Sequence, residues 1–147
     1  MYADGKRGRE LFESGYYCAE SVLTAVAEGR GISSSLFPKI ATGFCSGMAR
    51  TSGLCGAFTG GVMALGMVFG RENPEDDPLL CYDAVQELIE TFQQVHGTHR
   101  CSELLGCDLG TQKGQDEFTE RNLIESVCYR VTEDVTRMVL EIIGQRK

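Results

Sequence analysis

The segment GAFTGGVMALGMVF, at residues Gly56–Phe69, decides the fold that this sequence predicts. It has no charged residue, and its apolar side chains would cover every face of a helix, which is typical of a helix buried on all sides. Its four glycines cost stability inside a helix, each about 0.5–1 kcal/mol relative to alanine. That cost is reasonable where other elements, or a bound group, must approach the helix backbone closely. We therefore expect a buried central helix.

The residues on both sides of this segment place apolar side chains at helical spacing. The helical segments are residues 8–28, a stretch that begins after the serines at 33–35, residues 79–95, and residues 116–143. In the second of these, Pro38 falls in the first turn, and one face would carry Phe37, Ala41, Phe44 and Met48. Residues 97–114 are expected to be mostly loop, with one helical turn at 101–105. The sequence predicts a single all-α domain over residues 1–147, a helical bundle of about five helices around the glycine-rich helix.

The charge of the chain excludes some classes of partner. The formal net charge is −7, and nucleic-acid binding needs clustered lysine and arginine, so we expect no nucleic-acid partner. No stretch is apolar enough over about 20 residues to span a membrane. The first ten residues carry several charges and no apolar run follows them, so we recognise no export signal. These features predict a cytoplasmic protein.

Cysteine is the unusual component of this sequence. An odd number of cysteines without an export signal does not resemble a secreted disulfide framework. The sequence contains no C-x-x-C, so the thioredoxin-type motif is absent. In a reducing compartment such cysteines are either inert buried residues or chemically used. The seven are Cys18, Cys45, Cys55, Cys81, Cys101, Cys107 and Cys128.

Cys55 is the strongest candidate for a reactive thiol. It follows the turn at residues 51–53 and stands at the start of the predicted buried helix. Free N–H groups and the helix dipole stabilise a thiolate at that position, and Arg50 would add positive charge. We therefore expect a lowered pKa for Cys55 and a nucleophilic, redox or metal-binding role. The structural alternative is a small buried residue packed against glycine.

The other cysteines have weaker individual signals. Cys18 and Cys128 lie on apolar faces of the first and last helices, where a cysteine is usually part of the core. Their thiols would approach Cys55 if those two helices packed around the glycine-rich helix. Cys45 and Cys81 are interpreted as core-facing residues of amphipathic helices, and Cys107 as a loop residue.

A second group of possible ligands lies close together in the sequence. It comprises both histidines and two cysteines, His96, His99, Cys101 and Cys107. Four nitrogen and sulfur ligands of this kind can bind zinc, but the spacing matches no common zinc signature. The alternative is that His96 interacts with the C-terminus of its helix, where a cation is favoured. Zinc is the less favoured cofactor of this sequence.

The hexapeptide Cys55-Gly56-Ala57-Phe58-Thr59-Gly60 resembles the motif of the putative redox-active protein family with the C_GCAxxG_C_C cysteine pattern. Cys18 is similar to the first cysteine of that pattern. The stretch Gly47-Met48-Ala49-Arg50-Thr51 precedes the motif, as it commonly does in the family. The stretch 101–108, CSELLGCD, is similar to the third-cysteine element C-x-x-L-x-G-x-D, and Cys128 falls where the fourth cysteine belongs. Cys45, Cys81 and Cys107 are additional to the pattern, and a small residue such as glycine is expected at position 45.

The resemblance implies redox chemistry, since some members of the family carry selenocysteine in place of a motif cysteine. Related domains also occur in iron–sulfur and haem-containing electron-transfer proteins. Two chemical alternatives follow. In the first, Cys55 attacks as a thiolate, its partner is a redox protein or a small thiol, and the resolving cysteine is Cys18, Cys101 or Cys128. In the second, an iron–sulfur cluster is bound by Cys18, Cys55, Cys101 and Cys128, with Gly56 and Gly60 making room for it.

A third alternative involves no redox chemistry. The cysteines are then buried structural residues of an interaction module, and the glycine-rich helix packs tightly or forms a homo-oligomer contact. The three alternatives differ in metal content, in thiol count on reduction, and in the effect of Cys55→Ala.

Overall fold

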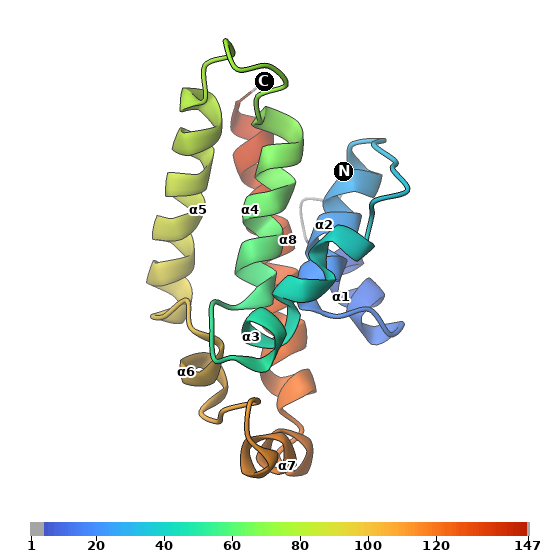
Figure 1. Ribbon diagram of the computed structural model, residues 1–147, viewed down its shortest axis with the longest axis vertical. Helices are drawn as coiled ribbons and strands as arrows, with labels where there is room; N and C mark the ends of the chain where they lie inside the picture. Colours follow the sequence, from blue (N-terminus) through green and yellow to red (C-terminus); the bar gives the residue numbers. More distant parts are fainter. Residues whose placement is uncertain (1–4, 147) are drawn as a thin grey trace.

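A computed structural model describes residues 5–146, and within that range the chain is entirely helical, with no strand (Figure 1). The predicted all-α class is confirmed, but the expected number of about five helices is too low. The range contains eight α-helices, one 3₁₀-helix (η1) and one π-helix (η2). Their bounds are α1 Lys6–Glu13, α2 Cys18–Gly29, η1 Lys39–Phe44, α3 Cys45–Arg50, α4 Gly56–Phe69, α5 Leu79–His96, α6 Cys101–Leu105, α7 Gln112–Glu120, η2 Ile124–Cys128 and α8 Tyr129–Gln145.

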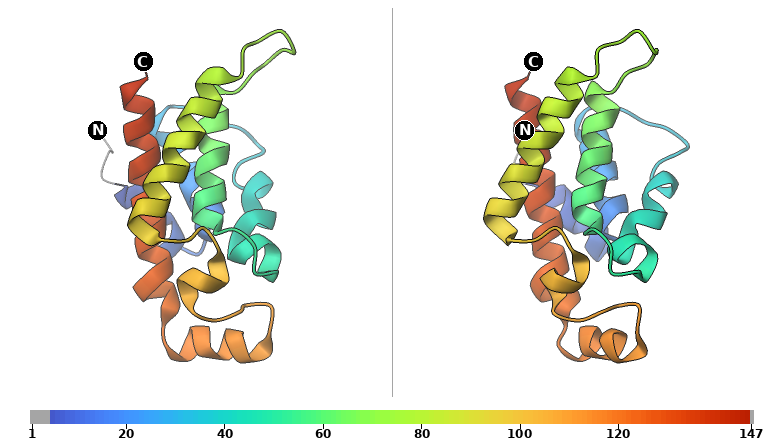
Figure 2. Two further views of the ribbon diagram at one scale, coloured as in Figure 1. Left: turned by 90° about the vertical axis from the view of Figure 1, so that its left-hand side faces the viewer. Right: turned by 60° about the vertical axis from the view of Figure 1, so that its left-hand side comes forward.

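The long helices α2, α4, α5 and α8 build the core. The glycine-rich helix α4 packs against the other three, and Figure 2 shows α4, α5 and α8 side by side from two further directions. Each helix contributes apolar residues to a single large cluster, as expected when amphipathic faces bury one another. Its largest fully buried apolar residues are Val22, Leu23, Val26, Leu65, Leu88, Phe92, Val135 and Val139.

Two glycines of α4 allow neighbouring helices to approach its backbone. A Cβ atom added at Gly60 would lie 2.7 Å from the carbonyl oxygen of Ala19 in α2, well inside van der Waals contact. A Cβ atom at Gly61 would lie 2.8 Å from a methyl group of Val135 in α8. The stability cost of glycine in a helix is therefore offset here by close packing of α2 and α8. Gly66 differs, because nothing lies within 4 Å of the position of its Cβ atom.

The short helices α3, α6 and α7 gather at one end of the long helices, the lower end in Figure 1. Two connecting segments pair there as a single antiparallel bridge between Leu54 and Arg100. The amide of Cys55 donates to the carbonyl of His99 at 2.7 Å, and the amide of Cys101 donates to the carbonyl of Gly53 at 2.9 Å. These two hydrogen bonds fix the start of α4 against the start of α6.

The segment before α4 differs most from the prediction. The expected helix carrying Phe37, Ala41, Phe44 and Met48 on one face is replaced by η1 and then by α3, whose backbone is a left-handed turn. Residues 46–50 all have φ between 56° and 68°, a conformation that costs about 1–2 kcal/mol for each residue other than glycine. Only Gly47 adopts it without that cost, and a Cβ atom at Gly47 would also lie 2.7 Å from the Cβ atom of Cys101.

The other predicted boundaries differ in smaller ways. The expected helix over residues 8–28 breaks between α1 and α2, and the expected helix over 116–143 divides into α7, η2 and α8. The expected helix over 79–95 is α5, which is one residue longer. The expected turn at 101–105 is α6. Within residues 5–146, none of the helices combines the length and the apolar character needed to cross a bilayer.

Candidate functional site

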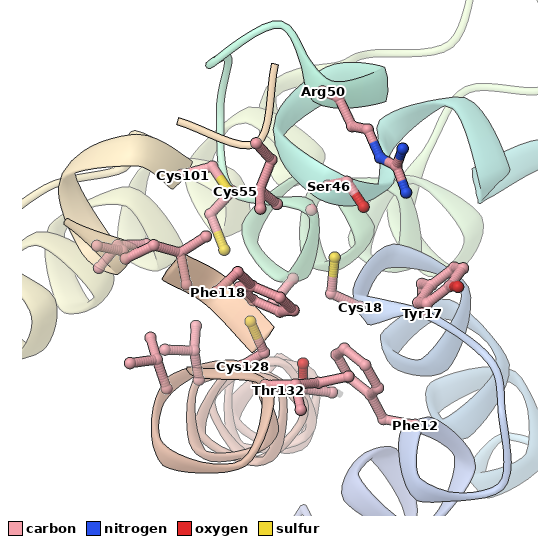
Figure 3. Close-up of a pocket in the computed structure, with 18 of the residues that line it drawn as sticks. Phe12, Tyr17, Cys18, Ser46, Arg50, Cys55, Cys101, Phe118, Cys128 and Thr132 are labelled. Carbon is pink, nitrogen blue, oxygen red and sulfur yellow. The ribbon is translucent and has the colours of Figure 1, made fainter. Parts of the chain in front are cut away.

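Four cysteines from four separate parts of the chain line one cavity of about 300 Å³ at the end where the short helices gather. They are the residues that sequence reasoning singled out: Cys18, Cys55, Cys101 and Cys128. Figure 3 shows Cys55, Cys101 and Cys128 on one side of the close-up and Cys18 on the other. All seven cysteines of the chain are free thiols in this structure.

Each of the four cysteines lies at a helix terminus. Cys18 and Cys101 are the first residues of α2 and α6, and Cys55 is the N-cap of α4. Cys128 ends the π-helix η2 and is the N-cap of α8, and π-helical turns are frequent at functional sites. The cavity therefore forms where the ends of these helices meet.

The bridge between Leu54 and Arg100 explains why two of the thiols face the same way. Side chains alternate between the two faces of paired extended segments. The side chains of Leu54 and Arg100 are exposed on one face, so those of Cys55 and Cys101 lie on the opposite face, toward the cavity. The two cysteines are diagonal neighbours across this bridge.

Burial controls the acidity of these thiols. It raises the pKa of Cys55 to about 11, although the amides of Ala57 and Phe58 at the start of α4 act in the opposite direction. The expectation of a lowered pKa for Cys55 is therefore wrong in this structure, because loss of solvent around the thiolate outweighs the helix start. Arg50 is not among the groups that shift this pKa.

Cys101 and Cys128 show the same effect. Burial raises the pKa of Cys101 to about 11, with further contributions from Cys107 and Asp108. The pKa of Cys128 is raised well above its usual range, first by burial and then by the charges of Cys55, Cys101 and Cys107. Like charges oppose ionisation only at short range, so Cys55, Cys101 and Cys128 form one group of interacting thiols.

Cys18 interacts with a different thiol. A hydrogen bond with Cys18 is the largest cause of the strongly raised pKa of Cys45, followed by burial. Both cysteines lie against Gly56: a Cβ atom added there would overlap the Cys18 sulfur and lie 3.2 Å from the Cα atom of Cys45. Cys45 was expected only to fill the core. It is buried, but it also forms a thiol pair with Cys18 that no spacing in the sequence indicated.

The glycines expected to make room for a bound group have other neighbours. The space above Gly60 is occupied by the backbone of Ala19, and the space above Gly56 by the Cys18 thiol. Gly56 also lines the cavity, whereas Gly60 does not. Both glycines thus allow α2 to pack closely against α4.

The two remaining cysteines differ in position. Cys107 is buried in a small cluster with Leu105 and Leu123, next to the thiols whose pKa it raises. Cys81 is half-buried in the first turn of α5 and does not line the cavity. Cys107 therefore belongs to the surroundings of the site, and Cys81 does not.

The histidines are directed away from the cysteines. His96 lies 3.3 Å from Asp134 of α8, and burial lowers its pKa. The His99 ring stacks on Phe92 with ring centroids 5.2 Å apart, and meets Phe58 edge-on. The expected zinc ligands His96, His99, Cys101 and Cys107 are thus not brought together. No three His, Cys, Asp or Glu side chains among residues 5–146 could hold one metal ion.

Six polar residues other than cysteine complete the cavity wall: Tyr17, Ser46, Arg50, Gln115, Thr119 and Thr132. Sequence reasoning noted Arg50 only for its charge near Cys55. It missed Thr132, because a threonine on the apolar face of α8 carries no signal that distinguishes it from a core residue. The remaining wall is mainly apolar and includes Phe12 and Phe118.

Comparison with family models matches residues 16–142 to a family described as putative redox-active protein (C_GCAxxG_C_C). Comparison with curated proteins found no match, and comparison with solved structures found none either. The matched range contains all seven cysteines and every residue of the cavity wall except Phe12. This chain therefore belongs to the putative redox-active protein family with the C_GCAxxG_C_C pattern.

Proposed function

We propose that the protein performs thiol–disulfide redox chemistry centred on Cys55, with Cys128 as the resolving thiol. The observation that carries this proposal is the group of three interacting thiols in one cavity. A disulfide needs two sulfurs that approach each other closely, and Cys55 and Cys128 line the same cavity. Among the thiols that raise the pKa of Cys128, Cys55 has the largest effect. Cys101, which raises the pKa of Cys55, is the second choice.

The reaction transfers two electrons and two protons. The Cys55 thiolate attacks one sulfur of a disulfide on a redox protein or a small molecule, whose other sulfur leaves and takes up a proton. The Cys128 thiolate then attacks the Cys55 sulfur of the mixed disulfide and releases the second partner sulfur, which is also protonated. The two cysteines end as a disulfide and the partner as two thiols.

The raised pKa values set the conditions for this reaction. A thiol with a pKa of about 11 is almost entirely protonated at neutral pH, and only the thiolate attacks. We therefore propose a pair that is stable as thiols near pH 7 and that reacts when a base or a bound partner removes the proton. This reverses the original expectation of an activated thiolate at the helix start.

Metal or cluster binding by Cys18, Cys55, Cys101 and Cys128 is the alternative. These residues do not fit a single metal ion, because no three ligands in the described part of the chain could hold one. An iron–sulfur cluster needs four thiolates around one inorganic core, whereas Cys18 pairs with Cys45 in this structure. No specific observation favours the cluster, and we assign no step to it.

Mapping of disulfides tests the proposal. The reduced protein is incubated with oxidised glutathione without oxygen, and peptides are analysed by mass spectrometry without reduction. We expect a Cys55–Cys128 link that disappears in Cys55→Ser and in Cys128→Ser and persists in the control Cys81→Ser. A protein in which Cys55 remains a thiol would contradict the proposal. Iron and sulfide in matching amounts after anaerobic purification would favour the cluster instead.

A further inference from the structure

The cavity has one charged wall residue, Arg50. Its side chain is exposed, and among residues 5–146 its guanidinium forms no hydrogen bond or ion pair. The cavity therefore offers a positive group that forms no ion pair in the described part of the chain, which favours a negatively charged ligand.

The left-handed turn of residues 46–50 determines where this arginine lies. Residues four apart share a face in a helical turn, and both Ser46 and Arg50 line the cavity. Figure 3 shows the Ser46 hydroxyl and the Arg50 side chain on the same side of the cavity, near Cys18 and Tyr17. The strained conformation thus brings a hydroxyl and a guanidinium to one wall, and strain of this kind is concentrated at binding sites.

A buried hydroxyl lies in the wall of the same cavity. The Thr132 side chain is fully buried, and its Oγ1 atom has no hydrogen-bond partner among residues 5–146. Buried polar atoms are almost always paired, so an unpaired one needs an explanation. Because Arg50 is exposed and Thr132 is buried, the two mark the outer and inner ends of the cavity.

The wall between these ends is apolar and includes Phe12, Leu105 and Phe118. A volume of about 300 Å³ is roughly twice that of an apolar cavity known to hold benzene. The cavity can therefore hold about twelve non-hydrogen atoms. Small-molecule sites are commonly apolar pockets with a few convergent polar groups.

We propose that this cavity binds a small organic carboxylate with an apolar body of about eight to ten carbons. The carboxylate accepts hydrogen bonds from Arg50 and Ser46, and the body lies against Phe12 and Phe118. Such a ligand lies beside the thiols. Its role as a redox substrate rests on the proposed function, whereas its binding does not.

Octanoate and 1-octanol are matched probes for this site, because they differ mainly in the negative charge. Titration calorimetry on the reduced protein is expected to show octanoate binding at least tenfold more tightly than 1-octanol. Arg50→Gln should weaken octanoate binding at least tenfold and leave 1-octanol binding unchanged. Arg50→Lys, which keeps the charge, should retain part of the affinity. Arg30→Gln is the control, because Arg30 is exposed and lies outside the cavity wall.

The outcomes separate this inference from the proposed function. Absence of octanoate binding, equal affinity for the two probes, or unchanged affinity in Arg50→Gln would each overturn the carboxylate site. Octanoate has no reducible group, so its binding does not depend on thiol chemistry. If the protein binds octanoate but forms no Cys55 disulfide, the carboxylate site is supported and the proposed function is overturned. If it forms the disulfide but does not bind octanoate, only the carboxylate site is overturned.

Discussion

The backbone amide of Cys55 donates a hydrogen bond to the carbonyl oxygen of His99 at 2.7 Å. This contact and its counterpart from Cys101 to Gly53 join two connecting segments that are far apart in the sequence. The His99 ring is in turn packed on Phe58, near the start of α4, and on Phe92, near the end of α5. These aromatic residues therefore support the part of the cavity wall that carries Cys55 and Cys101. The thiol site is therefore anchored to the main core.

Glycine-to-alanine substitutions at two positions of α4 are expected to change the free energy of unfolding in opposite directions. Gly60→Ala should lower the free energy of unfolding by about 1–3 kcal/mol, because the new Cβ atom would collide with the backbone of Ala19. Gly66→Ala should raise it by about 0.5–1 kcal/mol, because its Cβ position is open. Urea denaturation followed by circular dichroism measures both. Equal effects of the two substitutions would show that α2 does not pack on Gly60.

Two threonines one turn apart in α8 form a second matched pair. Thr132→Val should stabilise the protein by about 1 kcal/mol, because it removes a buried hydroxyl that has no partner. Thr136→Val should destabilise it by about 1 kcal/mol, because the Thr136 hydroxyl donates to the carbonyl of Thr132 at 2.8 Å. Both variants are compared by thermal and urea unfolding without added ligand. Destabilisation by Thr132→Val would mean that its hydroxyl has a partner in solution.

The raised thiol pKa values predict lower stability in alkaline solution. In the folded protein, Cys55 and Cys101 keep their protons to a pKa of about 11, against a usual value of 9.0. The unfolded chain therefore loses these protons first, and the free energy of unfolding falls as the pH rises from about 9 to 11. Cys55 alone contributes up to about 3 kcal/mol. Cys55→Ser should flatten this pH dependence and Cys81→Ser should not, as measured by urea unfolding between pH 7 and pH 11.

The contact between Cys18 and Cys45 predicts a second disulfide. Diamide accepts two electrons and two protons from a pair of thiols. We expect it to link these two cysteines because both lie against Gly56 and Cys18 raises the pKa of Cys45. Peptide mapping should find the link in the wild type and in Cys55→Ser, and lose it in Cys45→Ser. If Cys18 were instead linked to Cys55 or Cys128, the separation of the thiols into two groups would be refuted.

Among the long helices, α4 and α5 are predicted most closely from the sequence. Their bounds differ from expectation by at most one residue, because continuous apolar character and strong amphipathic periodicity are local properties. The left-handed turn could not be predicted in this way. Its position depends on Gly47 lying against Cys101, a contact between residues far apart in the chain.

The same distinction applies to the site. The motif residue Cys55 was identified from its place at a helix start, but its pKa shifts in the direction opposite to the local prediction. The cause is burial in the folded chain, which no local pattern describes. The pairing of Cys18 with Cys45 and the role of Thr132 in the wall also arise from tertiary packing.

The wide spacing of the cavity cysteines along the chain has a consequence during synthesis. Cys18 leaves the ribosome before Cys128 is made, and at about 5–20 residues per second the interval is roughly 5–20 seconds. In that interval the walls that bury Cys18 and Cys55 do not yet exist, so both thiols are open to solvent and to one another. The cavity around the early cysteines is therefore complete only once the late residues that line it, such as Phe118 and Cys128, have been made.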